Sequence, residues 1–360
     1  MKLQIIRNYL SENNIDALLI SSSISRYWLT NLSTSAGYVF VTATDSYYIC
    51  DSRYGLYLKE NNKVVDHIII IERSTKAYLE EINKLVEQWN IKSIAFEGEY
   101  LIFNEYDVFE KGLNNVNLVS VNSSNFRIIK DDYEIKNIGD GAKVLASAYE
   151  HIKNFIQIGM TEIQVRNELE KFIQEITYEE LSFKSIVAFG PNSAKPHASP
   201  SNNKLKENDI ILIDFGCKIK GYCCDMTRVF FINEPNPKLV EIFNIVLEAN
   251  KLGISIANKG TRACDVYQHV FDFIASKGYG DNFTHGLGHG LGVEIHENPR
   301  FTSADPTFLD NKMVGTIEPG IYLEGIGGVR IEDDIVINNC NAIVLTSDAS
   351  KELTILKKEI

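Results

Sequence analysis

The chain has 360 residues, of which 44% are hydrophobic and 23% are charged, and it carries a formal net charge of -12 at pH 7. This length exceeds the roughly 250 to 300 residues that one hydrophobic core supports, so we expect two domains. The acidic balance argues against nucleic acid as a partner, and no apolar run approaches the roughly 20 residues that span a bilayer, so we expect a soluble protein with no membrane partner.

Short apolar strands alternate with amphipathic helical sequence over the first 120 or so residues, which is typical of an α/β domain with its own core. The predicted strands are 17–20, 38–42, 67–71 and 93–96, and the predicted helix is 78–89. Charged helical sequence replaces the strands around Val121 to Asp132. We therefore predict an amino-terminal domain of residues 1–123 and a second domain of residues 124–360.

The second domain begins with helical sequence. We predict helices over 130–156, over 161–177 after a Thr161 cap, and over 238–257 after Pro235 and Pro237. The six cysteines include no Cys-x-x-Cys spacing, and residues 1–13 carry no secretory signal. A reducing, cytoplasmic location is therefore expected.

Two aspartates flank a predicted hairpin. Asp214 ends the apolar run 210–213, and Asp225 lies in a second strand-like segment. A hairpin centred on Ile219 and Lys220 places the two aspartates directly opposite each other, with Cβ atoms roughly 5 Å apart. Two ionised carboxylates at that distance repel unless one is protonated or a cation lies between them. The pair therefore predicts a cation site.

A second predicted hairpin, centred on Gly325, places Glu318 opposite Glu332. Segment 285–292 has four interleaved glycines, which make a helix improbable, so we predict a strand or loop there that supplies the imidazole of His289. Four carboxylates and one imidazole suit two divalent ions. His67, His151 and His269 lie in strand-like or amphipathic helical sequence, and structural roles are expected for them.

Asp214-Phe215-Gly216 also has a kinase interpretation, but no glycine-rich nucleotide loop or His-Arg-Asp segment accompanies it. The set of motifs instead resembles the aminopeptidase P, prolidase and creatinase family of pita-bread metallopeptidases, over roughly the whole chain. The resemblance rests on Asp214, Asp225, His289, Glu318 and Glu332 in that order, with Pro196-His197, 285–289 and His296-Glu297. It implies an α/β (α+β) fold, in which a creatinase-like domain precedes a curved antiparallel sheet covered by helices.

The resemblance further implies a metallo-exopeptidase that hydrolyses the Xaa-Pro bond of short proline-containing peptides through a hydroxide bridging two metal ions. It assigns Asp214 to one ion, Asp225 and Glu332 as bridges, and His289 and Glu318 to the other ion. Manganese is the metal that the family suggests, and cobalt, iron and zinc are alternatives. A homodimer is expected by analogy alone.

Other roles are also carried over from the resemblance. Glu318 is the expected general base. Arg330 and Thr227 are expected to orient the ligating carboxylates. Arg300 either meets a substrate carboxylate or lies exposed in a loop. The histidines expected on the substrate side are His197, His285 and His296.

Three other functions remain open at this point. A methionine aminopeptidase resembles the catalytic half but lacks an amino-terminal domain of this kind. Creatinase hydrolyses an amidino compound without the metal ligands, and some relatives are binding proteins without catalysis. This sequence retains all five ligands, which disfavours the last two functions. The sequence leaves open whether the enzyme is an aminopeptidase or a dipeptidase.

Overall fold

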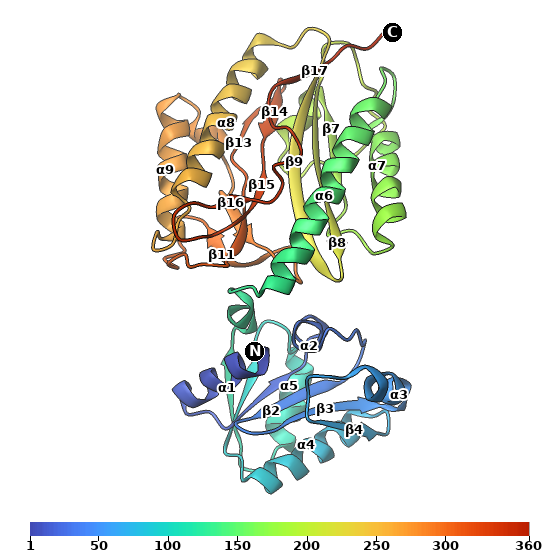
Figure 1. The fold of residues 1–360 in the computed structure, drawn as a ribbon, viewed down its shortest axis with the longest axis vertical. Helices are drawn as coiled ribbons and strands as arrows, with labels where there is room; N and C mark the ends of the chain where they lie inside the picture. The colour runs from blue at the N-terminus through green and yellow to red at the C-terminus, as the bar shows by residue number, and fades with distance from the viewer. Residues whose placement is uncertain (360) are drawn as a thin grey trace. The chain divides into compact units, whose positions relative to one another are not determined.

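The computed structural model describes residues 1–359 and divides the chain into two compact units between Arg127 and Ile128. Both units combine helices with strands, as Figure 1 shows, so the predicted α/β fold class is confirmed. No helix in the described residues is long and apolar enough to cross a membrane.

The amino-terminal unit contains a six-stranded sheet in the order β4-β3-β2-β1-β5-β6. Strand β2 is antiparallel to β1 and β3, whereas the pairs β3–β4, β1–β5 and β5–β6 are parallel. The strands are β1 Ala17–Ile20, β2 Tyr38–Thr42, β3 Ser46–Asp51, β4 His67–Ile71, β5 Ser93–Glu97 and β6 Asn117–Val121. The helices are α1 Lys2–Asn13, α2 Ser23–Thr30, α3 Ser52–Asn61, α4 Thr75–Trp89, α5 Phe103–Gly112 and the 3-10 helix η1 Ser123–Arg127.

Helix α4 illustrates how the sequence builds this unit. The Ser74 side chain caps the helix by accepting a hydrogen bond from the Ala77 amide. Residues at helical spacing, among them Ile82 and Leu85, are buried in the core that α4 shares with the sheet. The four predicted strands and the predicted helix are confirmed, and β3 and β6 are strands that the sequence analysis did not predict.

The carboxyl-terminal unit contains three sheets, with the orders β17-β9-β8-β7, β11-β10-β12-β15-β16 and β13-β14. The four-stranded sheet includes the long hairpin of β8 Ile210–Ile219 and β9 Tyr222–Ile232, with β7 Ile186–Phe189 and β17 Thr354–Leu356. The other strands are β10 Gly288–Gly290, β11 Glu297–Phe301, β12 Val314–Ile317, β13 Gly320–Leu323, β14 Gly327–Arg330, β15 Asp333–Val336 and β16 Ile343–Val344. All strand pairs in this unit are antiparallel except β9–β17.

Helices cover both faces of the β8–β9 hairpin. They are α6 Asp132–Phe155, α7 Glu162–Thr177, α8 Pro237–Ile256 and α9 Ala263–Ser276, with the 3-10 helices η2 Gly190–Ala194 and η3 Gly280–Asn282. Side chains such as Ile211 and Ile213 pack in a core with α6 and α7, whereas Ile210 and Leu212 pack in a core with α8 and α9. This two-residue alternation places Asp214 on the α8–α9 side of the hairpin. The predicted helices and the Thr161 cap are confirmed.

The predicted register of the first hairpin is wrong by two residues. The turn lies at Lys220 and Gly221, so Asp214 pairs with Thr227 and Asp225 pairs with Gly216. Both turn residues have positive φ, 48° and 72°, as a two-residue hairpin loop requires. The two aspartates are therefore diagonal neighbours on one face of the hairpin rather than a directly opposed pair.

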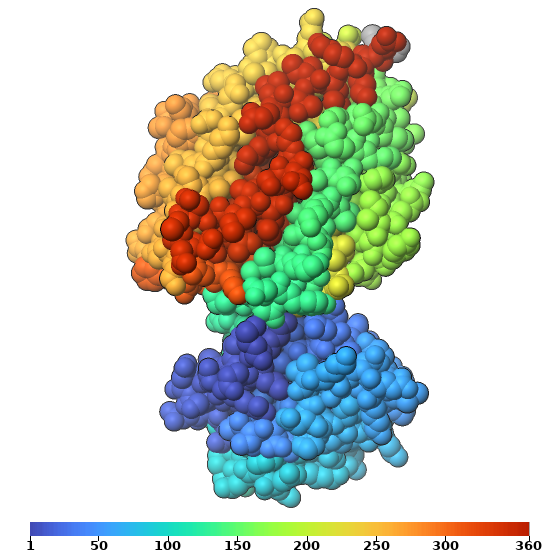
Figure 2. Space-filling view, in the orientation of Figure 1, coloured from blue at the N-terminus to red at the C-terminus, as the bar shows by residue number. Residues whose placement is uncertain are grey.

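The predicted register of the second hairpin is confirmed. Ile317 pairs with Asp333 and Gly320 pairs with Arg330, which places Glu318 opposite Glu332 between the two paired stretches. The tip is Gly325, which has a φ of 74°. The carboxyl-terminal segment then returns across the surface of this unit between α8 and α6, where Figure 2 shows it in red, and β17 pairs with β9.

Candidate metal centre

The five predicted ligands line one cavity of about 420 Å³ in the carboxyl-terminal unit. Asp214 and Asp225 come from β8 and β9, His289 comes from β10, and Glu318 and Glu332 come from the second hairpin. Four of these residues are at most 9% exposed, namely Asp214, Asp225, His289 and Glu332. The Glu318 side chain is 18% exposed and is the most accessible carboxylate of the group.

Three of these residues form a compact ligand cluster. Asp225, His289 and Glu332 each offer one ligand atom, and these atoms lie within 4.8 Å of one another. His289 Nε2 lies 3.9 Å from Asp225 Oδ2 and 3.4 Å from Glu318 Oε1. Asp214 lines the same cavity, and its Oδ2 accepts a hydrogen bond from Arg330 Nη2 at 2.5 Å.

Glycines allow β10 to run close to its neighbouring strands. A Cβ atom on Gly288 would lie 2.0 Å from the Thr316 carbonyl oxygen, and one on Gly290 would lie 2.2 Å from the Asn298 carbonyl oxygen. Only glycine fits such close backbone approaches. The segment was predicted as a strand or loop; residues Gly288–Gly290 form strand β10, which places His289 between β11 and β12, and the rest of the segment is not strand.

The pKa values of the buried groups at the centre indicate that bound cations would stabilise it. Burial, together with the charge of neighbouring carboxylates, raises the pKa values of Asp225 and Glu332 well above their usual range. Burial also raises the pKa of Glu318 to about 7 and lowers the pKa of His289 to about 3. The protein therefore concentrates carboxyl groups that are costly to ionise without a cation, next to a neutral imidazole that can bind a metal.

The polar atoms of the centre also fit this interpretation. Asp214 Oδ1 and Asp225 Oδ1 are buried and have no hydrogen-bond partner among the described residues. An unpaired buried polar atom costs roughly 1–3 kcal/mol, and more if it is charged. Carboxylate oxygens with free lone pairs beside an imidazole nitrogen are suitable ligands for divalent transition metals. The residues present therefore fit the divalent ions that the sequence predicted.

Arg330 connects the ligands to the surrounding protein. Its Nε donates to Thr227 Oγ1 at 3.1 Å, and that hydroxyl donates to Glu332 Oε2 at 2.6 Å. Its Nη2 donates to Asp214, and its Nη1 donates to the Tyr322 hydroxyl at 2.8 Å. One guanidinium group thus orients two carboxylates, because its planar fork fixes the directions of its donors.

Tyr322 fixes the protonation of His285. The Tyr322 hydroxyl accepts from Arg330, so its own proton is free for His285 Nε2, which lies 2.9 Å away. His285 Nδ1 lies 2.7 Å from the Gly286 carbonyl oxygen, an acceptor, so this nitrogen carries the proton. Burial and the Arg330 charge lower the pKa of His285 to about 4, which keeps the ring neutral.

The other predicted substrate-side residues lie around the same cavity. His296 is exposed, and its ring contacts His289 edge-on with centroids 4.4 Å apart. Arg300 lies in β11 rather than in a loop, and its Nη2 donates to the His296 carbonyl oxygen at 3.3 Å. His197 lines the cavity from an exposed position after η2. A buried ion pair of 2.8 Å between Lys130 and Glu297 anchors β11 next to His296.

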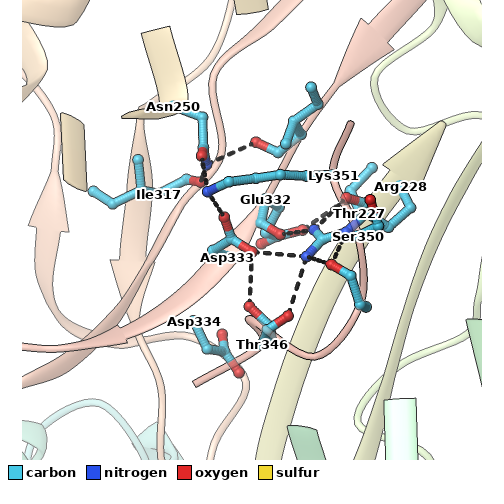
Figure 3. Close-up of polar contacts among 12 residues, drawn as sticks. Thr227, Arg228, Asn250, Ile317, Glu332, Asp333, Asp334, Thr346, Ser350 and Lys351 are labelled. Atoms are coloured by element: carbon cyan, nitrogen blue, oxygen red, sulfur yellow. Dashed lines mark hydrogen bonds and ion pairs between the residues drawn. The ribbon is translucent and has the colours of Figure 1, made fainter. Parts of the chain in front are cut away.

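A second polar layer lies behind Glu332, as Figure 3 shows. Asp333 accepts hydrogen bonds from Arg228 Nη2 at 2.8 Å, Thr346 Oγ1 at 2.8 Å and Lys351 Nζ at 2.6 Å. Burial alone would raise the pKa of Asp333, but the two cations outweigh it and lower that pKa to about 2. Lys351 also donates to Asn250 Oδ1 at 2.7 Å. This network ties the carboxyl-terminal segment to the strand that follows Glu332.

Sequence reasoning did not identify Tyr322 or the Asp333 network. A signal for Tyr322 existed, because the correctly predicted hairpin pairs Tyr322 with Gly328 and Gly320 with Arg330, so Tyr322 and Arg330 share a face. No local signal could find the Arg228–Asp333 pair, whose members are 105 positions apart.

Comparison with known proteins adds an independent finding. Residues 136–339 match the model of metallopeptidase family M24, and residues 2–129 match the creatinase/prolidase amino-terminal domain. A curated Xaa-Pro dipeptidase from Pyrococcus horikoshii is 34% identical over 363 residues, which cover 100% of this chain and 98% of the relative. A solved Xaa-Pro dipeptidase from Bacillus anthracis has a TM-score of 0.93 and 36% identity, with 99% of each chain covered. A solved X-Pro aminopeptidase from Thermotoga maritima has a TM-score of 0.87 and 30% identity, with 95% of this chain and 98% of that chain covered.

Proposed function

This chain belongs to metallopeptidase family M24, and we propose that it hydrolyses the bond before proline in dipeptides or short peptides, with two divalent ions bound at the metal centre. The observation that carries the proposal is the cluster of Asp225, His289 and Glu332, whose ligand atoms lie within 4.8 Å of one another. Relatives named as Xaa-Pro dipeptidases and X-Pro aminopeptidases support the substrate class.

The proposed ligand assignment is the one that the family resemblance implies. Asp225 and Glu332 would be shared by the two ions, Asp214 would serve one ion, and His289 and Glu318 would serve the other; all five residues line the cavity. When bound, the ions supply Lewis acidity, which acidifies water and polarises the peptide carbonyl. Arg330 holds Asp214 directly and Glu332 through Thr227, so both carboxylates keep a fixed orientation.

Glu318 is the proposed proton carrier. Its side chain is the most accessible carboxylate of the centre, and its Oε1 accepts a hydrogen bond from Thr316 Oγ1 at 3.2 Å. A carboxylate in this position can take a proton from water and deliver it to the proline nitrogen as the bond breaks. The proline nitrogen must gain a proton as the C–N bond breaks, so the leaving group requires such a donor.

Two histidines are proposed to act on the substrate. His296 is exposed at the cavity and edge-on to His289, where it can donate a hydrogen bond to the scissile carbonyl. His285 is held as a neutral ring with its proton on Nδ1, so its Nε2 can receive a proton only when the Tyr322 contact opens. Arg300 lines the cavity beside His296 and would meet the carboxylate of a dipeptide.

A panel of three peptides tests this proposal. The purified chain is incubated with Ala-Pro, Ala-Pro-Ala and Met-Ala-Ser, with and without added manganese, and the released amino acids are measured. Cleavage of Ala-Pro alone indicates a dipeptidase, and cleavage of Ala-Pro-Ala indicates an aminopeptidase. Release of methionine from Met-Ala-Ser, with both proline peptides left intact, contradicts the proposal and favours the methionine aminopeptidase alternative.

The manganese preference, the homodimer and the cytoplasmic location remain predictions. Metal analysis of the purified chain tests the first of these, because affinity order alone does not select the ion. Sedimentation of the full chain tests the second. A monomer in sedimentation would leave the metal chemistry unaffected and would remove only the dimer prediction.

A further inference from the structure

The two glutamates of the candidate metal centre lie where the second hairpin is not paired. The ladder of β12 with β15 ends at the pair Ile317 and Asp333, and the ladder of β13 with β14 begins beyond Glu318 and Glu332. Backbone groups at such a break need hydrogen-bond partners from outside the ladder, because an unpaired buried carbonyl group is costly. The partners at this break therefore bear directly on where the two glutamates lie.

Asn250 of α8 is such a partner for both arms of the hairpin. Its Nδ2 donates to the Ile317 carbonyl oxygen at 2.9 Å and to the Ile331 carbonyl oxygen at 3.4 Å. These two carbonyl groups belong to the residues immediately before Glu318 and Glu332. Asn250 itself is fully buried, with 0% of its surface exposed. One amide group thus joins the two arms at the peptide bonds that lead into the two glutamates.

Lys351 fixes the direction of this amide group. Its Nζ donates to Asn250 Oδ1 at 2.7 Å and to Asp333 Oδ2 at 2.6 Å, as Figure 3 shows. An ammonium group has three donors and no acceptor, so the amide must turn its oxygen toward it. An inverted amide would place its NH2 group against the ammonium group and its oxygen against two carbonyl oxygens. Only one orientation of Asn250 therefore satisfies every group.

Arg228 closes the network around Glu332. Its Nη1 donates to the Glu332 carbonyl oxygen at 2.6 Å, and its Nη2 donates to Asp333 Oδ1 at 2.8 Å. The peptide groups on both sides of Glu332 are therefore held, the preceding one by Asn250 and the following one by Arg228. Asp333 joins Arg228 to Lys351, which completes a ring of hydrogen bonds behind this glutamate.

We propose that Asn250, oriented by Lys351, is a positioning residue that sets the separation of Glu318 and Glu332 and thereby the affinity of the centre for divalent ions. The inference rests on the proposed function, in which both glutamates bind metal. It gives the carboxyl-terminal segment a part in the metal centre, because Lys351 lies after β16 and 101 positions from Asn250. Loss of a polar group that orients metal ligands from behind typically weakens metal binding by about 10- to 100-fold.

Asn250→Asp tests the proposal almost without changing the volume of the side chain. The variant keeps an oxygen for Lys351, but a carboxylate oxygen replaces the NH2 donor and faces the Ile317 and Ile331 carbonyl oxygens. Calorimetric titration of the metal-stripped full chain with manganese should give a dissociation constant at least about tenfold higher. Asn244→Asp is the matched control, since Asn244 lies on the same helix and is exposed. Its manganese affinity should stay unchanged.

Lys351→Met removes the ammonium group and leaves the sequence of α8 unchanged, so it decides the question if Asn250→Asp does not fold. The Lys351 side chain is 21% exposed, so a methionine can follow the same path toward solvent. We again expect manganese affinity to fall at least about tenfold, because the Asn250 amide loses the group that orients it. Lys357→Met is the control, since Lys357 lies in the same segment, is exposed and donates to the Asn233 carbonyl oxygen.

Urea unfolding separates positioning from a purely structural role. Bound manganese raises the unfolding midpoint by an increment that its affinity sets. A network that only stabilises the fold would lower the metal-free and metal-loaded midpoints together, whereas loss of a positioning residue must reduce the increment. Wild-type manganese affinity and a wild-type increment in the folded network variants overturn the inference alone. If the unsubstituted chain binds no manganese, the proposed function itself fails, and this inference fails with it.

Discussion

Arg330 is the residue that contacts most of the groups around the candidate metal centre directly. It contacts Asp214, Thr227 and Tyr322 with three different nitrogens, and it is 3% exposed. A lysine could not replace it, because a single ammonium group cannot hold three partners in one plane. The orientation of Asp214 and Glu332 therefore depends on one side chain.

Tyr322→Phe tests the path from Arg330 to His285. The substitution removes the hydroxyl that donates to His285 Nε2 and accepts from Arg330. We expect kcat to fall by about one to two orders of magnitude, because a hydrogen bond that involves a charged group is lost. Metal content should stay unchanged. Tyr178→Phe, at an 89% exposed tyrosine, is the control. Loss of metal in Tyr322→Phe would mean that Tyr322 supports the ligands rather than His285.

Asp225→Asn and Glu332→Gln test the proposed bridging positions. Each substitution removes a negative charge from the compact ligand cluster. We expect each variant to lose at least one ion per chain, as measured by elemental analysis of the dialysed protein. Glu324→Gln, at the exposed tip of the second hairpin, should keep the full metal content. Wild-type metal content in both cluster variants would contradict the assignment.

The sequence singled out five candidate ligands, because each one lies in a short motif whose residues are local, and all five line one cavity. The sequence did not predict contacts that depend on tertiary packing. Lys130 and Glu297 form a buried ion pair although 167 positions separate them. The contact of Lys351 with Asp333 likewise depends on the path of the carboxyl-terminal segment. Such pairs leave no periodicity or spacing that sequence analysis can detect.

The β8–β9 hairpin is the element that positions the two aspartates, and α6 packs directly against it. Gly141 of α6 faces the cross-strand pair Cys217 and Cys224, and the Cys217 thiol lies 3.5 Å from the Gly141 carbonyl oxygen. The predicted hairpin was correct in its existence and wrong in its register, because nothing in the sequence required Lys220 to adopt a left-handed backbone. Helix and strand type follow from apolar periodicity, whereas register depends on the conformation of two turn residues.

Two glycines of α6 give opposite predictions. A Cβ atom on Gly141 would lie 2.9 Å from the Cys224 Cβ atom, so Gly141→Ala should lower the free energy of unfolding by about 1–3 kcal/mol. A Cβ atom on Gly139 would meet only Leu345 Cδ2 at 3.9 Å, so Gly139→Ala should raise the free energy of unfolding by about 0.5–1 kcal/mol. Urea unfolding midpoints measure both effects. Equal changes in the two variants would show that helix propensity, rather than packing against the hairpin, sets the result.

At the scale of the whole molecule, the carboxyl-terminal unit concentrates buried acidic groups in a chain that is already acidic. Asp225, Glu318, Glu332 and Asp334 all have raised pKa values, chiefly because they are buried. The two-unit organisation was expected from chain length, and the six-stranded sheet of the first unit was expected only in part.

The stability of the metal-free chain should depend on pH in a defined direction. Burial raises the pKa values of Glu318 and Asp334 to about 7, above the usual range of a carboxyl group, so the folded chain binds more protons than the unfolded chain up to about pH 7. Their contribution to stability therefore falls as the pH rises through 7. Burial lowers the pKa values of His285 and His289 to about 4 and about 3, and these two residues oppose the trend only below the usual histidine pKa of about 6.5.

We therefore expect the metal-free chain to lose stability between about pH 6.5 and about pH 8. The metal-loaded chain should not show this loss, because bound cations favour the ionised carboxylates. Thermal unfolding at several pH values, with and without a chelator, measures the stability of the metal-free chain and of the metal-loaded chain. Metal-free stability that rises over this interval would contradict the electrostatic description of the centre.

The most direct test of the central claim is the recovery of activity in a chain stripped of metal. A chelator-treated sample receives manganese in steps, and the bound ions per chain and the proline released from Ala-Pro are measured together. We predict that the stripped chain is inactive, that proline release rises as the ions bind, and that Asp225→Asn binds fewer ions than the unsubstituted chain and does not regain proline release. Full hydrolysis of Ala-Pro by the stripped chain, or saturation with metal ions without hydrolysis of any Xaa-Pro peptide, would contradict the account.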